Sequence, residues 1–259
     1  MASRSVPGPA EAHLQQPMPP HLAIIYCAVL EDEIESFAKG LSHIVRLDKL
    51  PQGLHNEPDK LRSNLQSIVD EIERDNPEVE AIVVGYGLCS RGTEGVITKR
   101  CQFVVPRAHD CITLLLGSKE RYAQYVKDHP GTYWYSPGWN RHHIAPGKER
   151  YETLRAQYVE RFGEEDADFL MEEEQHWFST YDRATFVDLR VISSEPDQAY
   201  TQECAKWLGW NYDRQEGDPG LMRSLVSGVW PEEQFLVMEP GQSLRMTVDE
   251  RVIEASHAT

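Results

Sequence analysis

Short apolar runs and longer amphipathic segments alternate along the first half of the chain. The strand-length apolar runs are residues 21–27, 43–47, 81–86 and 102–106, and the segments with helical spacing of apolar residues are 31–41, 58–73 and 112–126. Short apolar runs bounded by turn residues predict strands that are buried on both faces. Because these strands alternate with segments long enough for crossover helices, we predict an α/β fold with a mainly parallel, Rossmann-like sheet.

A second α/β unit is predicted in the C-terminal half. Residues 184–189 and 234–238 are again short apolar runs, and residues 196–208 and 222–229 have helical spacing. The chain between the two units is of a different kind. Residues 130–150 are rich in aromatic and turn residues, which favours an irregular segment that closes over a site.

The same pattern sets the expected domain boundaries. Residues 1–20 contain several prolines and no apolar stretch, which predicts a disordered leader. Residues 21–242 form the α/β domain, with a helical insertion at 146–181 whose runs of Glu and Asp are typical of a solvated helix face. Residues 243–259 are expected to be a tail.

Composition narrows the class of partner. The 259 residues include 26 Lys and Arg against 42 Asp and Glu, which gives a net charge of -16. Nucleic-acid binding depends on clustered basic residues, so this charge argues against a nucleic-acid partner. No apolar run approaches the ~20 residues of a membrane span, and the N-terminus lacks the apolar core of a signal peptide. Five cysteines without an export signal then predict free thiols and a cytoplasmic location.

Reactive side chains gather where the predicted strands end. Cys27 ends the first strand, Cys89 lies in the glycine-rich loop after the third, and His109 and Cys111 follow the fourth. Open parallel sheets bind their ligands outside the carboxyl ends of the strands. These four residues are therefore expected to share one pocket, although the ordinary role of a buried cysteine is core packing.

Thiolate and imidazole are the ligands that zinc prefers, so His109 and the three cysteines predict a zinc site, with iron as the alternative ion. Ligands drawn from separate strands favour a site that meets a substrate, because an open fourth position activates a thiol or a water molecule. His55 is a candidate further ligand or proton carrier. In a metal-free alternative, the start of the following helix lowers the pKa of Cys111 and makes it a nucleophile.

The loop of residues 85–95 and its surroundings supply candidate substrate contacts. Its glycines allow backbone N–H groups to approach an anion, and Arg91 adds a donor, but no Walker loop and no complete G-x-G-x-x-G is present. Arg107, just past the fourth strand, is expected to clamp a carboxylate or phosphate, unless it forms a structural ion pair. We also assign Tyr86 and Trp139 to substrate binding, since rings such as Trp139 stack on planar groups or hold methylated ammonium groups.

Three segments carry a resemblance to a known family, namely Gly85–Cys89, Pro106–Gly117 and Pro130–Trp139. They resemble a prokaryotic domain-of-unknown-function family, number sixteen-thirty-eight, in a match that extends over residues 22–241. Members of that family are often encoded near corrinoid-dependent methyltransferase systems. The resemblance therefore implies a corrinoid protein as an expected partner, and it implies no activity by itself.

Methylcobamide-to-thiol methyltransferases give the metal hypothesis a concrete form. They use a zinc site of His-x-Cys and a distant cysteine, and the set of His109, Cys111 and Cys89 is similar in residue type. The order along the chain differs, because the distant cysteine comes first here, and those enzymes are barrels. The similarity is therefore one of chemistry and not of fold.

These inferences combine into one expectation and two alternatives. We expect a cytoplasmic metal-binding α/β protein that acts in methyl or other one-carbon group transfer on a small-molecule substrate, with zinc or iron as the cofactor. Corrinoid is expected only through a partner. The alternatives are a non-catalytic accessory or binding protein for a corrinoid methyltransferase, and a metal-free cysteine hydrolase.

Overall fold

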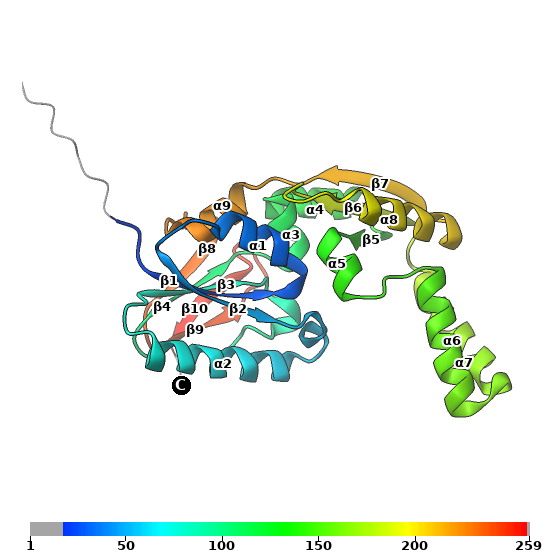
Figure 1. The fold of residues 1–259 in the computed structure, drawn as a ribbon, viewed down its shortest axis with the longest axis horizontal. Helices are drawn as coiled ribbons and strands as arrows, with labels where there is room; N and C mark the ends of the chain where they lie inside the picture. Colours follow the sequence, from blue (N-terminus) through cyan, green and yellow to red (C-terminus); the bar gives the residue numbers. More distant parts are fainter. Residues whose placement is uncertain (1–17, 258–259) are drawn as a thin grey trace, which may run out of the picture.

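A computed structural model describes residues 18–257 (Figure 1). The disordered leader expected for residues 1–20 therefore lies almost wholly outside the described residues. The strands are β1 (Leu22–Cys27), β2 (Ile44–Leu50), β3 (Ala81–Gly85), β4 (Gln102–Pro106), β5 (Thr132–Tyr135), β6 (Arg183–Asp188), β7 (Asn211–Glu216), β8 (Phe235–Met238), β9 (Gln242–Met246) and β10 (Ile253–His257). The α-helices are α1 (Glu31–Ala38), α2 (Pro58–Asp75), α3 (Cys111–Leu116), α4 (Lys119–Asp128), α5 (Pro137–His142), α6 (Lys148–Phe162), α7 (Glu164–Phe178), α8 (Glu195–Leu208) and α9 (Gly220–Ser227). Short 3-10 helices are η1 (Ala28–Leu30), η2 (Gln52–Asn56) and η3 (Cys89–Arg91).

Within residues 18–257 the strands form three sheets. The largest has the order β2-β1-β3-β4-β8, with parallel pairing except between β4 and β8, which run antiparallel. The second sheet has the order β5-β6-β7 and is parallel throughout. β9 and β10 form an antiparallel hairpin. The prediction of an α/β fold with a mainly parallel central sheet is thus confirmed.

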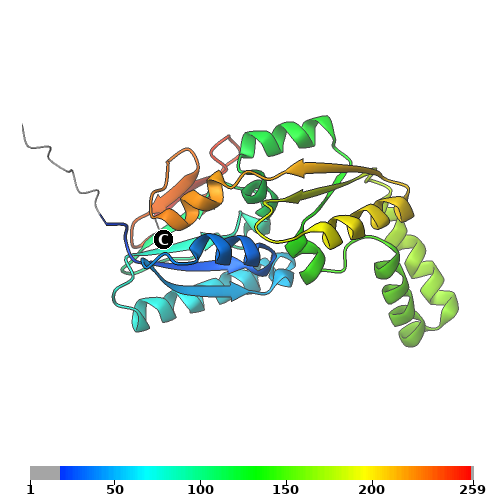
Figure 2. The ribbon, with the colours of Figure 1, turned by 45° about the horizontal axis from the view of Figure 1, so that its top comes forward.

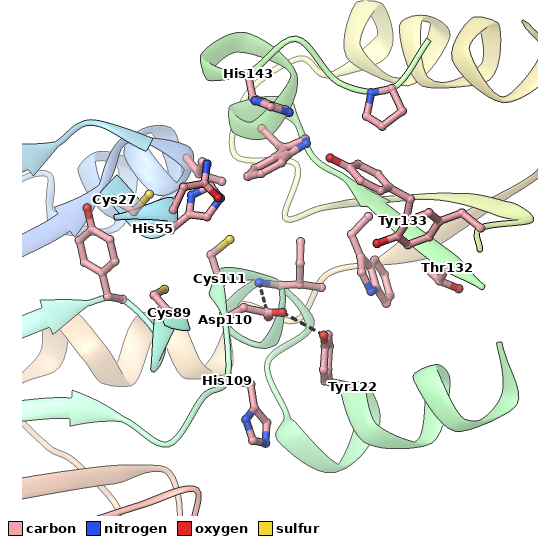
Figure 3. Close-up of a pocket in the computed structure, with 18 of the residues that line it drawn as sticks. Cys27, His55, Cys89, His109, Asp110, Cys111, Tyr122, Thr132, Tyr133 and His143 are labelled. Carbon is pink, nitrogen blue, oxygen red and sulfur yellow. Dashed lines mark hydrogen bonds between the residues drawn. The ribbon is translucent and has the colours of Figure 1, made fainter. Parts of the chain in front are cut away.

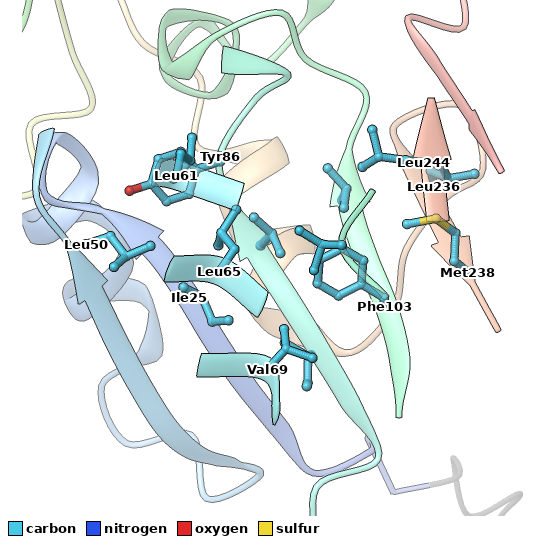
Figure 4. Close-up of a cluster of buried hydrophobic side chains, with 14 of the residues drawn as sticks. Ile25, Leu50, Leu61, Leu65, Val69, Tyr86, Phe103, Leu236, Met238 and Leu244 are labelled. Atoms are coloured by element: carbon cyan, nitrogen blue, oxygen red, sulfur yellow. The ribbon is translucent and has the colours of Figure 1, made fainter. Parts of the chain in front are cut away.

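The five-stranded sheet is covered on both faces, which explains the continuous apolar runs of its central strands. On one face α2 contributes Leu61, Leu65 and Val69, and the β9–β10 hairpin contributes Leu244 (Figure 4). On the other face lie α1, α3 and α9, with Ile34 among the buried side chains. Burial of each such aliphatic side chain stabilises the fold by roughly 1.5–3 kcal/mol.

The smaller sheet has its own cover. Residues of α8, with Cys204 and Ala205 among them, pack on the face that carries Tyr135 and Phe186. On the opposite face the Tyr125 ring of α4 lies 4.8 Å from the Trp134 ring, measured between centroids. The two sheets lie side by side in the molecule, and the α6–α7 hairpin projects away from both (Figure 2).

Several predicted boundaries need correction. Residues 234–238, expected in the second unit, form β8 and pair with β4 of the first sheet. Residues 130–150, expected to be irregular, contain β5 and α5. The single helix expected at 112–126 is two helices, because Gly117 adopts a left-handed conformation (φ +76°) that ends α3.

The remaining expectations concern the helical insertion, the C-terminal tail and membrane-spanning helices. Residues 148–178 form the helices α6 and α7, as their pattern predicted, and the acidic runs are largely exposed. Residues 243–257 are not a structureless tail, because they supply most of β9 and all of β10. None of the helices in the described part of the chain combines the length and apolar composition that a membrane crossing requires.

Candidate functional site

A cavity of about 640 Å³ lies between the two sheets, at the carboxyl ends of β1, β3 and β4. Its size falls within the roughly 300–1,000 Å³ typical of small-molecule sites. The first unit contributes Cys27, Cys89 and Cys111, which we call the three cavity cysteines. The facing side is an aromatic wall, which consists of Tyr133, Trp134, Trp139, Trp177 and Tyr181.

The three cavity cysteines come from three adjacent strands. Cys27 is the last residue of β1, Cys89 lies four residues after β3, and Cys111 begins α3 after β4. Their sulfur atoms point toward the same space in Figure 3. All three are free thiols; Cys27 is buried, and Cys89 and Cys111 are partly exposed. Parallel strands place the residues at their carboxyl ends along one edge of the sheet. For this reason, cysteines that are distant in sequence lie at the same cavity.

The loop that carries Cys89 is fastened to the loop that carries Cys111. The N–H of Leu88 donates to the carbonyl of Ala108 (2.8 Å), and the N–H of Cys89 donates to the carbonyl of His109 (3.1 Å). Gly87 permits this approach, because a Cβ there would lie 2.6 Å from the backbone nitrogen of Asp110. Cys89 itself has a φ of +43°, a strained conformation for a residue with a side chain.

Asp110 holds the start of α3 and therefore the position of Cys111. Its carboxylate accepts hydrogen bonds from the N–H groups of Ile112 (3.0 Å) and Thr113 (3.2 Å), which makes it the N-cap of the helix. The other carboxylate oxygen accepts a hydrogen bond from the Tyr122 hydroxyl (2.9 Å) (Figure 3). Burial raises the pKa of Asp110, and these hydrogen bonds act in the opposite direction.

Burial also raises the pKa of each cavity thiol. For Cys89 and Cys111, the negative charges of Asp110 and of the neighbouring thiolates raise the pKa further. The same direction holds for Cys27, where burial is the main cause. An activated cysteine nucleophile has a lowered pKa. The raised pKa of Cys111 is therefore the opposite of what the metal-free hydrolase alternative expected.

His55 lines the cavity, and one of its ring nitrogens is hydrogen-bonded to the backbone. Its Nδ1 lies 2.7 Å from the carbonyl oxygen of Gln52, so Nδ1 carries the proton and donates. A backbone carbonyl that fixes the tautomer in this way is common for histidines that bind metals or move protons. The ring centroid of His55 is 5.6 Å from that of Trp139, so the first unit meets the aromatic wall here.

α5 brings Trp139 to the cavity through a close backbone contact. Gly138 lies against the carbonyl group of Val29 in η1, where any Cβ would collide with the carbonyl oxygen. This contact joins the second unit to the turn that follows Cys27. His143 packs on the far side of Trp139, with 4.6 Å between ring centroids, and burial lowers its pKa.

Two polar atoms on the cavity make no hydrogen bond of good geometry with the described residues. One is the hydroxyl oxygen of Tyr86, which is 1% exposed and has the Cys27 thiol as a neighbour. The other is the indole nitrogen of Trp139. Each has a polar neighbour within reach, which is the Cys27 thiol for Tyr86 and the Tyr133 hydroxyl for Trp139.

Three predicted site residues need correction. His109 borders the cavity, but its side chain is exposed and points away from the three cavity cysteines in Figure 3. Arg107 is not on the cavity, because its guanidinium donates to the backbone carbonyls of Glu232 (2.8 Å) and Arg251 (3.0 Å). Arg91 is exposed, points to Glu94 (2.8 Å) and does not line the cavity.

The expected zinc ligands do not meet at one point. Among the described residues, no three His, Cys, Asp or Glu side chains are grouped closely enough to hold a single metal ion. His55, Tyr86 and Trp139 do line the cavity, as expected. Sequence reasoning missed Asp110. Its signal was an aspartate directly before an apolar helical segment, which is the usual place of an N-cap residue. It also missed the aromatic contribution of α7, which no local pattern indicated.

The chain is similar to a known protein family. A family model with the description "Protein of unknown function (DUF1638)" matches residues 49–226. No curated protein and no solved structure matches the chain. The matched range contains Cys89, Cys111 and the aromatic wall, and Cys27 lies before it.

Proposed function

Because this chain belongs to the DUF1638 family, whose description names no activity, we propose its function from the geometry of the cavity. The protein transfers a methyl or other one-carbon group on a small organic substrate in the cavity that Cys27, Cys89 and Cys111 line, and these three thiols would have to approach one another to hold a single metal ion. The observation that carries this proposal is the meeting of three thiols from three strands with an aromatic wall in one cavity.

The three thiols are the type of ligand that a thiophilic metal takes, although the structure does not group them around one point. Thiolate sulfur is the soft ligand that selects zinc, copper(I) and iron–sulfur centres over magnesium or calcium. Burial keeps the three thiols protonated, because it raises their pKa values. A bound cation reverses that preference, since a coordinating thiol is deprotonated and its proton is released. Zinc and iron, the ions expected from the sequence, both satisfy this chemistry.

The residues around the thiols have separate tasks. Asp110 fixes Cys111 through the helix cap, and the Tyr86 hydroxyl lies beside the Cys27 thiol, where it donates a hydrogen bond to that sulfur. The Nε2 atom of His55 accepts the proton that the substrate loses. A metal in this place supplies a position where a substrate sulfur or nitrogen stays deprotonated and nucleophilic.

The aromatic wall suits the carbon part of the substrate. Rings surround methyl groups with apolar surface, and they attract a methylated ammonium group through their negative faces. In the transfer, the electron pair of the substrate's sulfur or nitrogen forms the new bond to carbon. The old bond of that carbon breaks, and its electrons stay on the donor, which is a methylated amine or a methylated corrinoid held by a partner protein.

Metal analysis of purified protein tests the centre. We expect zinc or iron in the wild-type protein, loss of most of it in Cys111→Ser, and no loss in Cys101→Ser. Cys101 is the matched control because it is buried, lies at the opposite end of β4 and donates to the carbonyl of Val79 (3.3 Å), as a serine would. Equal metal content in wild type and Cys111→Ser would refute the proposal.

Turnover assays with a thiol acceptor, and with a methylated amine or a methylated corrinoid protein as the donor, distinguish the two remaining functions. An enzyme consumes one of these donors, and Cys111→Ser abolishes the reaction. A protein that holds metal without turnover, and that forms a complex with a purified corrinoid protein, fits the accessory alternative instead. The projecting α6–α7 hairpin favours that alternative, because Phe162 and Phe169 are exposed on it at 45% and 63%.

A further inference from the structure

Arg150 is a charged group on the cavity that the proposed function does not use. It lies in the first turn of α6 and lines the cavity. Among the described residues of the lining, Arg150 is the only lysine or arginine, and Asp110 is the only aspartate or glutamate. Both carboxylate oxygens of Asp110 are already hydrogen-bonded, one to N–H groups at the start of α3 and the other to Tyr122. The charge that the cavity can offer to a ligand is therefore that of Arg150.

Contacts outside the cavity fix the guanidinium of Arg150. Its Nη1 and Nη2 atoms both donate to the same carboxylate oxygen of Glu174, at 3.2 Å each, and its Cζ atom lies 5.2 Å from the centroid of the Phe178 ring. Neither Glu174 nor Phe178 lines the cavity. The bonds to Glu174 use two of the five N–H groups of a guanidinium, and Arg150 makes no other hydrogen bond within the described part of the chain. The other N–H groups remain for a ligand.

The surroundings of Arg150 strengthen its contacts with an anion. The side chain is only 22% exposed, and it is close enough to Tyr133 and His143 for its charge to act on both rings. Hydrogen bonds between an arginine and a carboxylate are stronger where rings and burial exclude water. Burial, together with the charge of Arg150, lowers the pKa of His143, so this histidine is neutral and adds no second charge.

The cavity differs in charge from the molecule as a whole. The chain has a net charge of -16, whereas the charge presented to the cavity is positive. An aromatic wall by itself attracts cations to the faces of its rings, but Arg150 repels them. The ligand that suits this combination is an anion with a single charge and an apolar body.

We propose that the cavity binds a small organic carboxylate, with its carboxylate group on Arg150 and its carbon skeleton against the aromatic wall. The inference rests on the proposed function only in treating this cavity as the substrate site, and it names the class of substrate. The flat guanidinium donates charge-assisted hydrogen bonds to carboxylate oxygens. A phosphate is a poorer fit, because it carries about two charges and the described lining supplies a single lysine or arginine.

The two ends of such a ligand meet different groups. Arg150 belongs to α6, on the side of the aromatic wall, whereas Cys27, Cys89 and Cys111 follow strands of the first sheet. A carboxylate held by Arg150 therefore directs the other end of the ligand toward the three cavity cysteines. The substrate atom that gains or loses the one-carbon group then lies at that end.

Isothermal titration calorimetry of the full chain with three probes of similar size tests the proposal. Phenylacetate is the anionic probe, phenylacetamide the uncharged probe and benzyltrimethylammonium the cationic probe. We expect phenylacetate to bind with a Kd of about 1 mM or less, and at least about tenfold more tightly than phenylacetamide. Benzyltrimethylammonium should bind more weakly than phenylacetate, because Arg150 repels it.

Three variants assign the difference between the probes to Arg150. Arg150→Gln should weaken phenylacetate binding about tenfold or more and leave phenylacetamide binding unchanged. Arg155→Gln is the matched control and should bind both probes like wild type, because Arg155 lies on the same helix, pairs with Asp168 (2.8 Å) and does not line the cavity. Glu174→Gln removes the carboxylate that competes for Arg150, so phenylacetate should bind to it at least as tightly as to wild type. Circular dichroism checks that each variant is folded.

Equal binding of phenylacetate and phenylacetamide overturns the proposal, and so does the absence of binding by all three probes. Equal losses in Arg150→Gln and Glu174→Gln would show that Arg150 only supports the fold, which also overturns it. If Arg150→Gln does not fold, the three probes with wild type and Glu174→Gln decide. Phenylacetate binding without any methyl transfer supports this inference and refutes the proposed function, and transfer to uncharged substrates alone does the reverse.

Discussion

Glu33 is a carboxyl group enclosed by the protein. It lies on α1 with a side chain that is 2% exposed, and one of its carboxylate oxygens has no hydrogen-bond partner among the described residues. Burial, with a smaller contribution from the charge of Asp188, raises the pKa of Glu33 to about 7. The folded protein therefore keeps this carboxyl protonated at pH values where the unfolded chain has already released the proton.

This difference predicts a dependence of stability on pH. Below the ordinary pKa of 4.5, both states hold the proton and Glu33 has no effect on the pH dependence. As the pH rises from 4.5 to about 7, only the folded state holds it, so wild type loses up to about 3 kcal/mol relative to Glu33→Gln. Above that range the difference is constant. Urea unfolding of wild type and Glu33→Gln at several pH values measures this difference in the free energy of unfolding.

The control for this measurement is Glu172→Gln, because Glu172 is exposed on α7. It should unfold with the same pH dependence as wild type. If the difference between wild type and Glu33→Gln does not change between pH 4.5 and pH 7.5, the buried carboxyl does not titrate as described.

At the scale of elements, the contact between α5 and η1 joins the two units. Gly138 sits directly against the carbonyl of Val29, and this contact brings Trp139 beside the turn that follows Cys27. The amphipathic pattern of a helix does not predict this contact, because a glycine contributes no apolar side chain to that pattern. The close approach of two backbones decides the distance between the thiols and the aromatic wall.

Gly138→Ala is expected to lower the free energy of unfolding by about 1–3 kcal/mol. The added methyl group collides with the Val29 carbonyl, which is backbone and cannot rotate away, so α5 must shift. Urea denaturation measures the loss. Gly53→Ala is the matched control, since a Cβ at Gly53 meets nothing within 4 Å and should change stability by less than about 1 kcal/mol.

A second readout separates the contact from ordinary overpacking. If α5 moves, Trp139 moves with it, and the tryptophan fluorescence of folded Gly138→Ala should differ from that of wild type and Gly53→Ala. Equal stability and equal fluorescence in the three proteins would show that the contact between α5 and η1 has no structural importance.

At the scale of the whole molecule, the α6–α7 hairpin is the most separate part. The helices project from the two sheets, and α6 has no fully buried residue (Figures 1 and 2). Ala167 and Met171 of α7 are buried. At the base of the hairpin, Arg150 pairs with Glu174 (3.2 Å), and Arg150 and Trp177 reach the cavity. The outer turns are thus separable from the site, and the base is not.

Replacing residues 153–170 by a short Gly-Ser linker should leave a folded protein whose melting temperature is within about 4 °C of wild type. The excised part carries acidic surface and contributes no residue to the lining of the cavity. Thermal unfolding followed by circular dichroism measures the change. The comparison variant removes residues 148–178, and with them Arg150 and Trp177, and should melt at a clearly lower temperature. Similar melting of the two variants would contradict the division between base and outer turns.

Local patterns in the sequence determined the central strands of the first sheet and the cysteine edge. The apolar runs that became β1, β3 and β4 are encoded by their own residues, because a strand buried on both faces must be apolar throughout. Parallel pairing then places Cys27, Cys89 and Cys111 at one edge. Local pattern and a general rule of sheets were sufficient for this part of the site.

Only the tertiary structure decided which partners the other segments found. An apolar strand such as β8 does not encode its neighbour, so its pairing with β4 depends on the packing of the whole chain. The same holds for Arg107, whose guanidinium donates to the backbone carbonyls of Glu232 and Arg251, more than a hundred residues along the chain. It holds also for His109, whose backbone joins the Cys89 loop while its side chain faces solvent. Sequence spacing fixes where a residue leaves a strand, whereas the direction of its side chain is set by contacts with segments far along the chain.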